Sequence, residues 1–454
     1  MRSKRWSVLA WAGFLAVLAL TGHSRAAEEP AAAKAPRLKA LVGGRLIDGY
    51  GGRPLADSVV LIEGERIKAV GRVGELAVPR GAEVISTEGM SVLPGLWDCH
   101  VHLMIVGHSD YEYWDKTYPP RFRDTIMPAA ARQLLLAGVT SARDLGAPLE
   151  DILAVRERIA HGEIPGPNLF VTGPFLQHEP YPGTELFRWG LHGADDARSK
   201  VDKLADAGVD LIKLIDQDQM TPEEVQAVVE QAHKRKLSVT AHSHRAEEIR
   251  RGIAAGVDGF EHTGLGTAPS YPEDLYALIR GRANTLYWTP TVAPLLTYEE
   301  TRDNPERLDD PRWQLGLPKD IVADIRGSLA HPDQLAYYRA VPARRPTVAR
   351  KFQQLRESGV TMLIGTDSGI PGFFHSDSTW REIVSWIRVL GVEPMDALRA
   401  ATFWPAVAQK VEADLGTVTP GKYADVIAVR GDVLRYPELL SDVDLVVKHG
   451  VRVK

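Results

Sequence analysis

Two histidines separated by one residue, His100 and His102, stand at the end of an apolar run that is typical of a buried strand. Successive side chains of a strand point to opposite faces, so residues two apart share a face. The two imidazoles could therefore bind one metal ion, since neutral imidazole is a common ligand for zinc. A His-x-His pair alone is equally compatible with two structural histidines, and the interpretation depends on the rest of the chain.

Further candidate metal ligands stand at or near the ends of other strand-like segments. His242, His262 and Asp367 each follow a short apolar run, and Lys213 lies inside one. In a parallel (β/α)8 barrel these strand ends open at one mouth, where the active sites of such barrels lie. Four imidazoles and a carboxylate suit two divalent metal ions, and zinc is the expected metal.

Lys213 is the unusual member of this set, because an ammonium ion within an apolar strand carries a large desolvation cost. Two neighbouring dications would also repel it. A lysine with a lowered pKa that has reacted with carbon dioxide becomes an anionic carbamate, whose two oxygens could bridge two metals. The alternative is a lysine that reaches solvent or pairs with Asp210 or Asp216.

The middle of the chain alternates between helical patterns and apolar runs. A glycine at position 138, 208, 256 or 359 ends a predicted helix, and a strand-like run begins directly afterwards. Thr221, Pro222 and Glu224 mark a helix start with a capping box. Eight strands are predicted, at residues 91–99, 140–145, 169–172, 211–215, 237–241, 259–261, 286–289 and 362–365.

Eight alternating β and α units predict an α/β protein with a (β/α)8 barrel over residues 91–414. A doubly wound sheet is the less favoured alternative, because no glycine-rich phosphate loop follows an early strand. The charged segment at about 297–345 is longer than a usual connection and predicts a helical insert. Both chain ends carry short strand patterns, so residues 37–90 and 415–454 are expected to form one small β-sandwich domain.

The first residues are typical of a targeting segment. A basic start with Arg2, Lys4 and Arg5 precedes an apolar stretch at 6–20 and small residues near 24–26. Residues 1–26 are predicted to be a signal peptide and 27–36 a linker, with an uncleaved membrane anchor as the alternative. The mature protein is therefore expected to be exported, periplasmic or secreted, without stable membrane insertion.

The composition of the 454-residue chain is that of an ordinary globular protein with a net charge of -5. This charge gives no reason to expect a nucleic-acid partner, and a small-molecule substrate is expected instead. The sequence is compatible with a homo-oligomer. Cys99 is the only cysteine, which excludes an intramolecular disulfide, and it is expected to be a buried small residue rather than a nucleophile.

The ordered set of motifs resembles the amidohydrolase superfamily, in its imidazolonepropionase-like and prolidase-like branch. The matching segments are residues 46–49, 94–102, 212–213, 241–244, 259–262, 365–369 and 416–425. The resemblance implies that His100 and His102 bind the more buried metal ion and that His242 and His262 bind the other. It also implies that carboxylated Lys213 bridges the two ions and that Asp367 binds metal and transfers protons.

The reaction implied by this resemblance is hydrolysis of a carbon–nitrogen amide bond by a metal-bridging hydroxide. The expected substrate is a small amide with a free carboxylate, either a dipeptide of the Xaa-Pro type or an N-acyl amino acid. Cyclic amides, lactones and organophosphate esters are alternatives, because one site can attack several electrophiles. A scaffold without activity is disfavoured because none of the ligands is missing.

Candidate substrate contacts lie in the segments that follow the strands. His178, Tyr181 and His244 could hold the substrate carboxylate, although His244 could instead support the metal ligands. Relatives often carry a Gly-Gly-His turn near residue 178, and this chain lacks its glycines. Arg143 is expected to form an internal ion pair with Asp144 rather than an anion site. The residue before His262, Glu261, is expected to face away from the metals.

Overall fold

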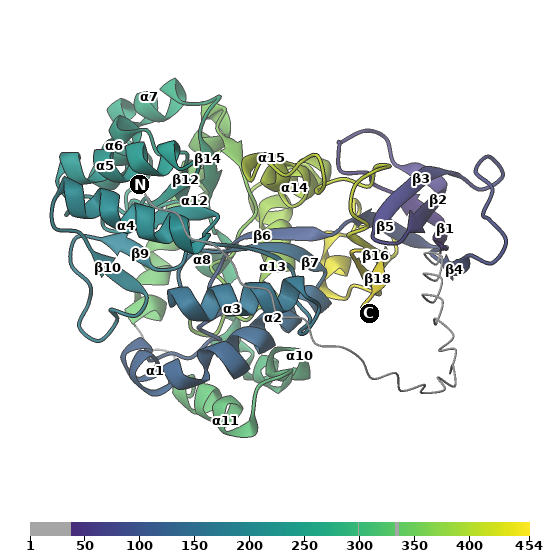
Figure 1. Ribbon diagram of the computed structural model, residues 1–454, viewed down its shortest axis with the longest axis horizontal. Helices are drawn as coiled ribbons and strands as arrows, with labels where there is room; N and C mark the ends of the chain where they lie inside the picture. The colour runs from purple at the N-terminus through teal and green to yellow at the C-terminus, as the bar shows by residue number, and fades with distance from the viewer. Residues whose placement is uncertain (1–37, 298, 332–335) are drawn as a thin grey trace, which may run out of the picture. The chain divides into compact units, whose positions relative to one another are not determined.

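The computed structural model describes residues 38–297, 299–331 and 336–454 (Figure 1). The predicted signal peptide at 1–26 and the linker at 27–36 lie outside the described residues, so export stays a prediction. Over the described ranges, none of the helices combines the length and the apolar character that a membrane span requires.

Strands from both ends of the chain form one mixed sheet of eight strands. Its path is β18-β17-β16-β5-β1-β2-β3, and β4 pairs with β1. Both faces are covered, because alternate residues of β2 enter two different apolar clusters: Val60 and Ile62 pack in one, Val59 and Leu61 in the other. The strands are β1 (Leu38–Leu46), β2 (Leu55–Glu63), β3 (Arg66–Arg72), β4 (Glu83–Ser86), β5 (Met90–Pro94), β16 (Val426–Arg430), β17 (Leu445–Lys448) and β18 (Val451–Arg452).

The middle of the chain forms two parallel sheets, which together with the helices give an α/β fold. One sheet has the order β6-β7-β8 and the other β10-β9-β11-β12-β13-β14-β15. The strands are β6 (Leu96–Val101), β7 (Val139–Asp144), β8 (Asn168–Val171), β9 (Phe175–Gln177), β10 (Arg188–Gly190), β11 (Leu211–Leu214), β12 (Ser238–His242), β13 (Gly259–Glu261), β14 (Tyr287–Thr289) and β15 (Thr361–Met362).

Backbone hydrogen bonds connect the two parallel sheets at both ends. The Cys99 amide of β6 donates to the Ile364 carbonyl, just beyond β15, at 2.9 Å. The Asp210 amide, just before β11, donates to the Val171 carbonyl of β8 at 2.9 Å. The carboxyl ends of β6, β11, β12 and β13 therefore lie near one another, as a site built from several strands requires.

Gly95 divides the strand that was predicted over residues 91–99. The part before it, β5, pairs with β1 and β16 of the mixed sheet, and the part after it, β6, pairs with β7. The apolar run is continuous across both parts, so periodicity alone did not reveal the change of partner. A Cβ at Gly95 would lie 2.1 Å from Thr140 Oγ1, which explains why a glycine stands at this junction.

Helices separate most of the parallel strands, and α5 and α6 pack against β12 (Figure 1). The predicted glycine ends are confirmed at α4 and α6, where Gly208 and Gly256 adopt left-handed conformations with φ of 87° and 90°. Over its described residues, the predicted insert contains α9 to α11 and the start of α12. The helices are α1 (Tyr111–Thr117), α2 (Met127–Leu136), α3 (Leu149–Ala160), α4 (Ala194–Ala207), α5 (Pro222–Lys234), α6 (Ala246–Ala255), α7 (Glu273–Gly281), α8 (Ala293–Thr297), α9 (Glu300–Asp303), α10 (Pro311–Gln314), α11 (Lys319–Ser328), α12 (Ala336–Ser358), α13 (Ser378–Val384), α14 (Pro394–Ala400) and α15 (Phe403–Ala408).

Candidate metal centre

Five of the predicted metal ligands meet where the parallel strands end. The Nε2 atoms of His100 and His102 lie 3.5 Å and 3.3 Å from Asp367 Oδ1. The His262 ring lies 4.9 Å from the His100 ring and 4.8 Å from the His242 ring. Residues from four different strand ends therefore converge on a space of a few ångströms.

Two groups of three side chains could each hold an ion. One comprises His100, His262 and Asp367, and the other comprises His242, His244 and His262. Within each group, one ligand atom per residue lies within 4.8 Å of the others. Because His262 belongs to both groups, the two candidate positions are adjacent, as a centre with two metal ions requires. His244 thus stands among the candidate ligands as well as in the predicted substrate-contact set.

The buried polar atoms of this centre fit the presence of metal ions. Over the described residues, His100 Nε2, His262 Nε2, His242 Nδ1 and Lys213 Nζ are buried without a hydrogen-bond partner. Buried polar atoms in proteins nearly always have a partner, and divalent ions would supply one for the three imidazole nitrogens. Burial also lowers the pKa of His100 to about 4, which keeps this imidazole neutral and able to bind metal.

Lys213 is fully buried on β11. Burial lowers the pKa of its amine to about 8, although the carboxylates of Glu261 and Asp367 oppose this shift. The alternative in which Lys213 reaches solvent or forms an ion pair is wrong, because Asp210 pairs with Arg156 and Asp216 with Arg245. The amine therefore remains available for chemistry within the centre.

Two site residues adopt left-handed backbone conformations that are unusual outside glycine. The φ angle is 72° at His262 and 61° at Asp367. Such conformations cost free energy and concentrate at functional sites. They also interrupt the alternation of side chains along a strand. Odd or even spacing between residues therefore no longer tells which face a neighbouring side chain points to.

This interruption explains why the prediction for Glu261 was wrong. Its carboxylate does not face away from the centre but lies below it, where Oε2 accepts a hydrogen bond from His100 Nδ1 at 2.9 Å. Glu261 Oε1 accepts from Arg143 Nη2 at 2.9 Å. Because Nδ1 of His100 donates its hydrogen to Glu261, Nε2 is the lone-pair nitrogen that is left to face the candidate metal position.

Arg143 does form an internal ion pair beneath the centre, but the predicted partner was wrong. It pairs with Glu261, and its Nε also donates to the Cys99 carbonyl at 2.7 Å. Asp144 instead accepts the Leu103 and Gly146 amides at 2.8 Å and 3.1 Å. Cys99 itself is buried, and burial raises the pKa of its thiol to about 12, so it is not a nucleophile at neutral pH.

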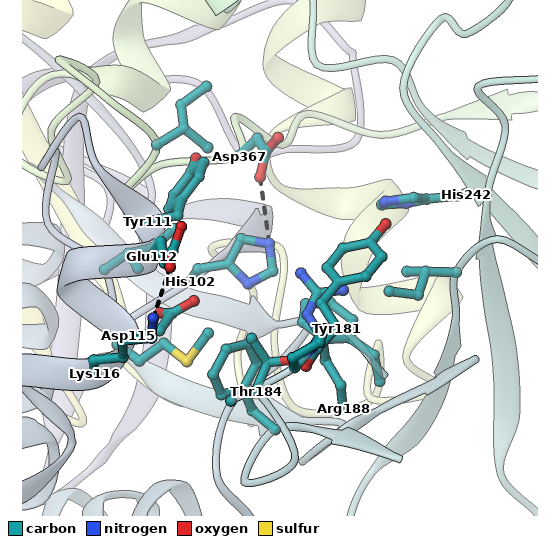
Figure 2. A pocket seen from close by; sticks show the side chains of 18 of the residues that line it. His102, Tyr111, Glu112, Asp115, Lys116, Tyr181, Thr184, Arg188, His242 and Asp367 are labelled. Carbon is teal, nitrogen blue, oxygen red and sulfur yellow. Dashed lines mark hydrogen bonds and ion pairs between the residues drawn. The ribbon is translucent and has the colours of Figure 1, made fainter. Parts of the chain in front are cut away.

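A pocket of about 600 Å³ opens above the centre (Figure 2). His102, His242, His262 and Asp367 line it on the side of the metal centre. The predicted substrate contacts Tyr181 and His244 also line the pocket, as do apolar side chains such as Phe175 and Ile215. His178 is absent from this lining, and its Nδ1 lies 4.0 Å from a carboxylate oxygen of Glu224. The structure therefore does not bring His178 to the candidate substrate site.

Arg188 and Asp115 are two of the four charged pocket residues that the sequence analysis missed. Arg188 lies beside Tyr181, with its guanidinium carbon 4.5 Å from the Tyr181 ring centre (Figure 2). Asp115 enters the pocket from α1. Neither stands at the end of a long apolar run, since β10 has three residues and α1 seven, so no pattern in the sequence marked them.

Residues 91–453 match the amidohydrolase family. This chain belongs to the amidohydrolase family. The match covers both parallel sheets and the strands from the C-terminal end, and it confirms the resemblance found in the motifs. As an amidohydrolase, the protein is a hydrolase that acts on carbon–nitrogen bonds of small molecules.

Individual relatives of this amidohydrolase are distant. An ochratoxinase from Aspergillus niger is 26% identical over 441 residues, which cover 87% of this chain and 81% of the relative. An imidazolonepropionase from Micrococcus luteus is 24% identical over 393 residues, which cover 83% of this chain and 88% of that protein. The crystal structure of a Xaa-Pro dipeptidase with bound methionine in its active site superposes with a TM-score of 0.71 at 24% identity, covering 92% of this chain and 100% of that one.

Proposed function

We propose that this amidohydrolase binds two divalent metal ions, most suitably zinc, and hydrolyses a small amide that carries a free carboxylate. Xaa-Pro dipeptides and N-acyl amino acids are the substrate classes in view. We also propose that the two parallel sheets close into a (β/α)8 barrel, and that the strands of the chain ends form a separate small β-sandwich domain. Export to the periplasm or the medium, proposed from the N-terminal sequence, would bring the enzyme to external peptides.

Metal binding is supported by the donor set of the centre. His100, His102 and Asp367 would hold one ion, while His242 and His262 would hold the other. Lys213, as a carbamate, would bridge them; the lowered pKa of its buried amine raises the fraction of the neutral form, which is the form that reacts with carbon dioxide. Two bound divalent ions would lower the pKa of a water molecule and polarise the substrate carbonyl.

Asp367 is the residue proposed to move the proton. Although burial alone would raise its pKa, the neighbouring His100 and His102 lower it to about 2, so the carboxylate is ionised at neutral pH. It can accept a proton from the attacking water and deliver it to the leaving nitrogen. Its place in the pocket lining supports this role.

The free carboxylate of the substrate is proposed to bind Arg188. The position of this arginine in the pocket is the main support for the proposed substrate class. Its Nη1 donates to Gln177 at 3.0 Å, while Nε is buried and has no partner among the described residues. Tyr181 is held next to it, because the tyrosine hydroxyl donates to Asp216 at 3.0 Å. A guanidinium with an unused donor in the pocket beside the metal centre suits a carboxylate one residue away from the scissile amide.

The test compares a good dipeptide or N-acyl amino acid substrate with its C-terminal amide. A charge-assisted hydrogen bond contributes roughly 1.5–3 kcal/mol, so blocking the carboxylate should lower kcat/KM roughly ten- to hundredfold. Arg188→Gln should abolish this preference. Arg198→Gln is the matched control, because Arg198 lies on α4 and pairs with Asp195 at 2.9 Å. Equal cleavage of both compounds, or turnover of lactones and phosphotriesters only, would contradict the proposed substrate class.

A further inference from the structure

Asp115 is a pocket carboxylate that none of the preceding roles uses. It lies on α1 and lines the pocket on the side opposite β10, the strand that carries Arg188 (Figure 2). Its Oδ1 is buried and has no hydrogen-bond partner in the part of the chain that the structure describes. The side chain is only partly exposed, and the pocket lining around it includes Met104 and Ile105, which offer it no hydrogen bond.

Asp115 differs in its surroundings from Glu112, a carboxylate on the same helix. Glu112 also lines the pocket, but its side chain is 80% exposed and pairs with Lys116 at 2.6 Å. Burial raises the pKa of Asp115 to about 6, and the positive charge of Arg188 opposes this shift. Asp115 is thus ionised at neutral pH while one of its oxygens lacks a partner, which is a costly state for a buried carboxylate.

We infer that Asp115 binds a cationic ammonium group of the substrate, across the pocket from the carboxylate that Arg188 holds. This inference rests on the proposed function and narrows it to amides that carry both charges. The positive charge of Arg188 acts on Asp115 only from a distance, because the two side chains form no ion pair within 4.0 Å among those found over the described residues. A substrate with an anionic and a cationic end would satisfy both residues at once.

Two sources of the ammonium group fit this chemistry. In a dipeptide, the free α-ammonium lies one carbon from the scissile carbonyl. In an N-acylated substrate, the ammonium would come from a basic side chain on the residue that bears the carboxylate. Asp115 is a specificity-determining residue in both cases, and matched pairs of substrates distinguish the two.

The first pair is alanyl-phenylalanine and isobutyryl-phenylalanine, in which a methyl group replaces the α-ammonium. The second pair is isobutyryl-lysine and isobutyryl-norleucine. The enzyme used is the zinc-loaded full chain. In one of the two pairs, kcat/KM for the cationic substrate should exceed kcat/KM for the neutral substrate by roughly ten- to hundredfold, which is the effect of a charge-assisted hydrogen bond. Asp115→Asn should reduce that ratio to near one, and mainly by raising KM for the cationic substrate.

Glu112→Gln is the matched control, because it removes a carboxylate from the same helix and the same pocket while leaving Asp115 in place. It should keep the substrate preference of the unmodified enzyme. Ratios near one for both pairs in the unmodified enzyme, or a preference that survives Asp115→Asn, would overturn the inference. Equal cleavage of a substrate and its C-terminal amide by the unmodified enzyme would instead contradict the role of Arg188. The two proposals therefore fail in different measurements.

Discussion

Two layers of buried polar side chains meet at His100, and they differ in how their atoms are bonded. In the upper layer, at the pocket, Lys213 Nζ and the facing nitrogens of His100, His242 and His262 are buried without hydrogen-bond partners over the described residues. In the lower layer, Glu261 joins His100 Nδ1 to Arg143 through hydrogen bonds of 2.9 Å each. The same imidazole is thus bonded on its lower side and free on its upper side.

The lower layer continues at Asp98, which is fully buried. Its carboxylate accepts hydrogen bonds from the Thr366 amide at 3.0 Å, the Thr366 hydroxyl at 2.7 Å and the Thr379 hydroxyl at 2.8 Å. A group that is both buried and fully bonded holds the strand ends in place. Buried atoms without partners stabilise nothing by themselves, and their concentration in one layer indicates where ligands bind.

Replacing Lys213 by alanine should have the largest effect, because it removes the proposed bridging ligand from the upper layer. We expect kcat to fall by about a thousandfold or more, since metal ions contribute several kcal/mol to transition-state stabilisation. Zinc affinity should fall as well. Formate or propionate should restore part of the rate by occupying the position of the carbamate. Normal turnover of Lys213→Ala would exclude the bridging role.

Asp367→Asn should come next. Asparagine retains an oxygen that can bind metal, but it cannot accept and deliver a proton. We therefore expect kcat to fall by about a hundred- to a thousandfold with little change in KM, within the usual range for general acid–base catalysis. Steady-state kinetics measures both constants. An unchanged kcat would assign the proton transfer to one of the histidines.

Glu261→Gln tests the junction of the two layers. The change leaves Arg143 with an uncompensated buried charge, so the free energy of unfolding should fall by about 3–5 kcal/mol. It also weakens the hydrogen bond that orients His100, so zinc affinity should fall roughly ten- to hundredfold. Urea unfolding and zinc titration measure the two effects. A protein that is less stable but binds zinc normally would limit Glu261 to a structural role.

Thr379→Val should have the smallest effect and only on the lower layer. Valine has nearly the same shape but removes the hydroxyl that donates to Asp98. We expect the free energy of unfolding to fall by about 1–3 kcal/mol, because a buried carboxylate loses one partner. The kcat/KM measured on the same preparation should stay close to that of the unmodified enzyme. A large loss of activity without a loss of stability would mean that the two layers are not separate in function.

The sequence predicted the upper layer better than the lower one. Each candidate metal ligand stands within or just beyond a short apolar run, and parallel strands bring such positions to one edge whatever the details of packing. The partners of Arg143 and Glu261 could not be predicted in this way. They depend on the left-handed backbone at His262, which reverses the expected direction of one side chain, and no local pattern encodes that conformation.

The pocket walls show a second limit of sequence reasoning. Asp115 and Arg188 come from a seven-residue helix and a three-residue strand, and they meet only through the tertiary structure. Tyr181 and His244 were predicted and do line the pocket. His178 has the same kind of position in the sequence, yet the chain turns its side chain towards Glu224. His178 directly follows β9, whereas Tyr181 lies four residues beyond it, so distance along the chain from a strand end does not predict which side chain reaches the pocket.

The central claim is that the unpartnered atoms of the upper layer hold two metal ions. Elemental analysis of the full chain, after reconstitution with zinc and bicarbonate and removal of excess metal, tests it most directly. We predict two zinc ions per chain, since His100, His102, His242, His262, Lys213 and Asp367 supply ligands for both. Fewer than one ion per chain after reconstitution would contradict the account.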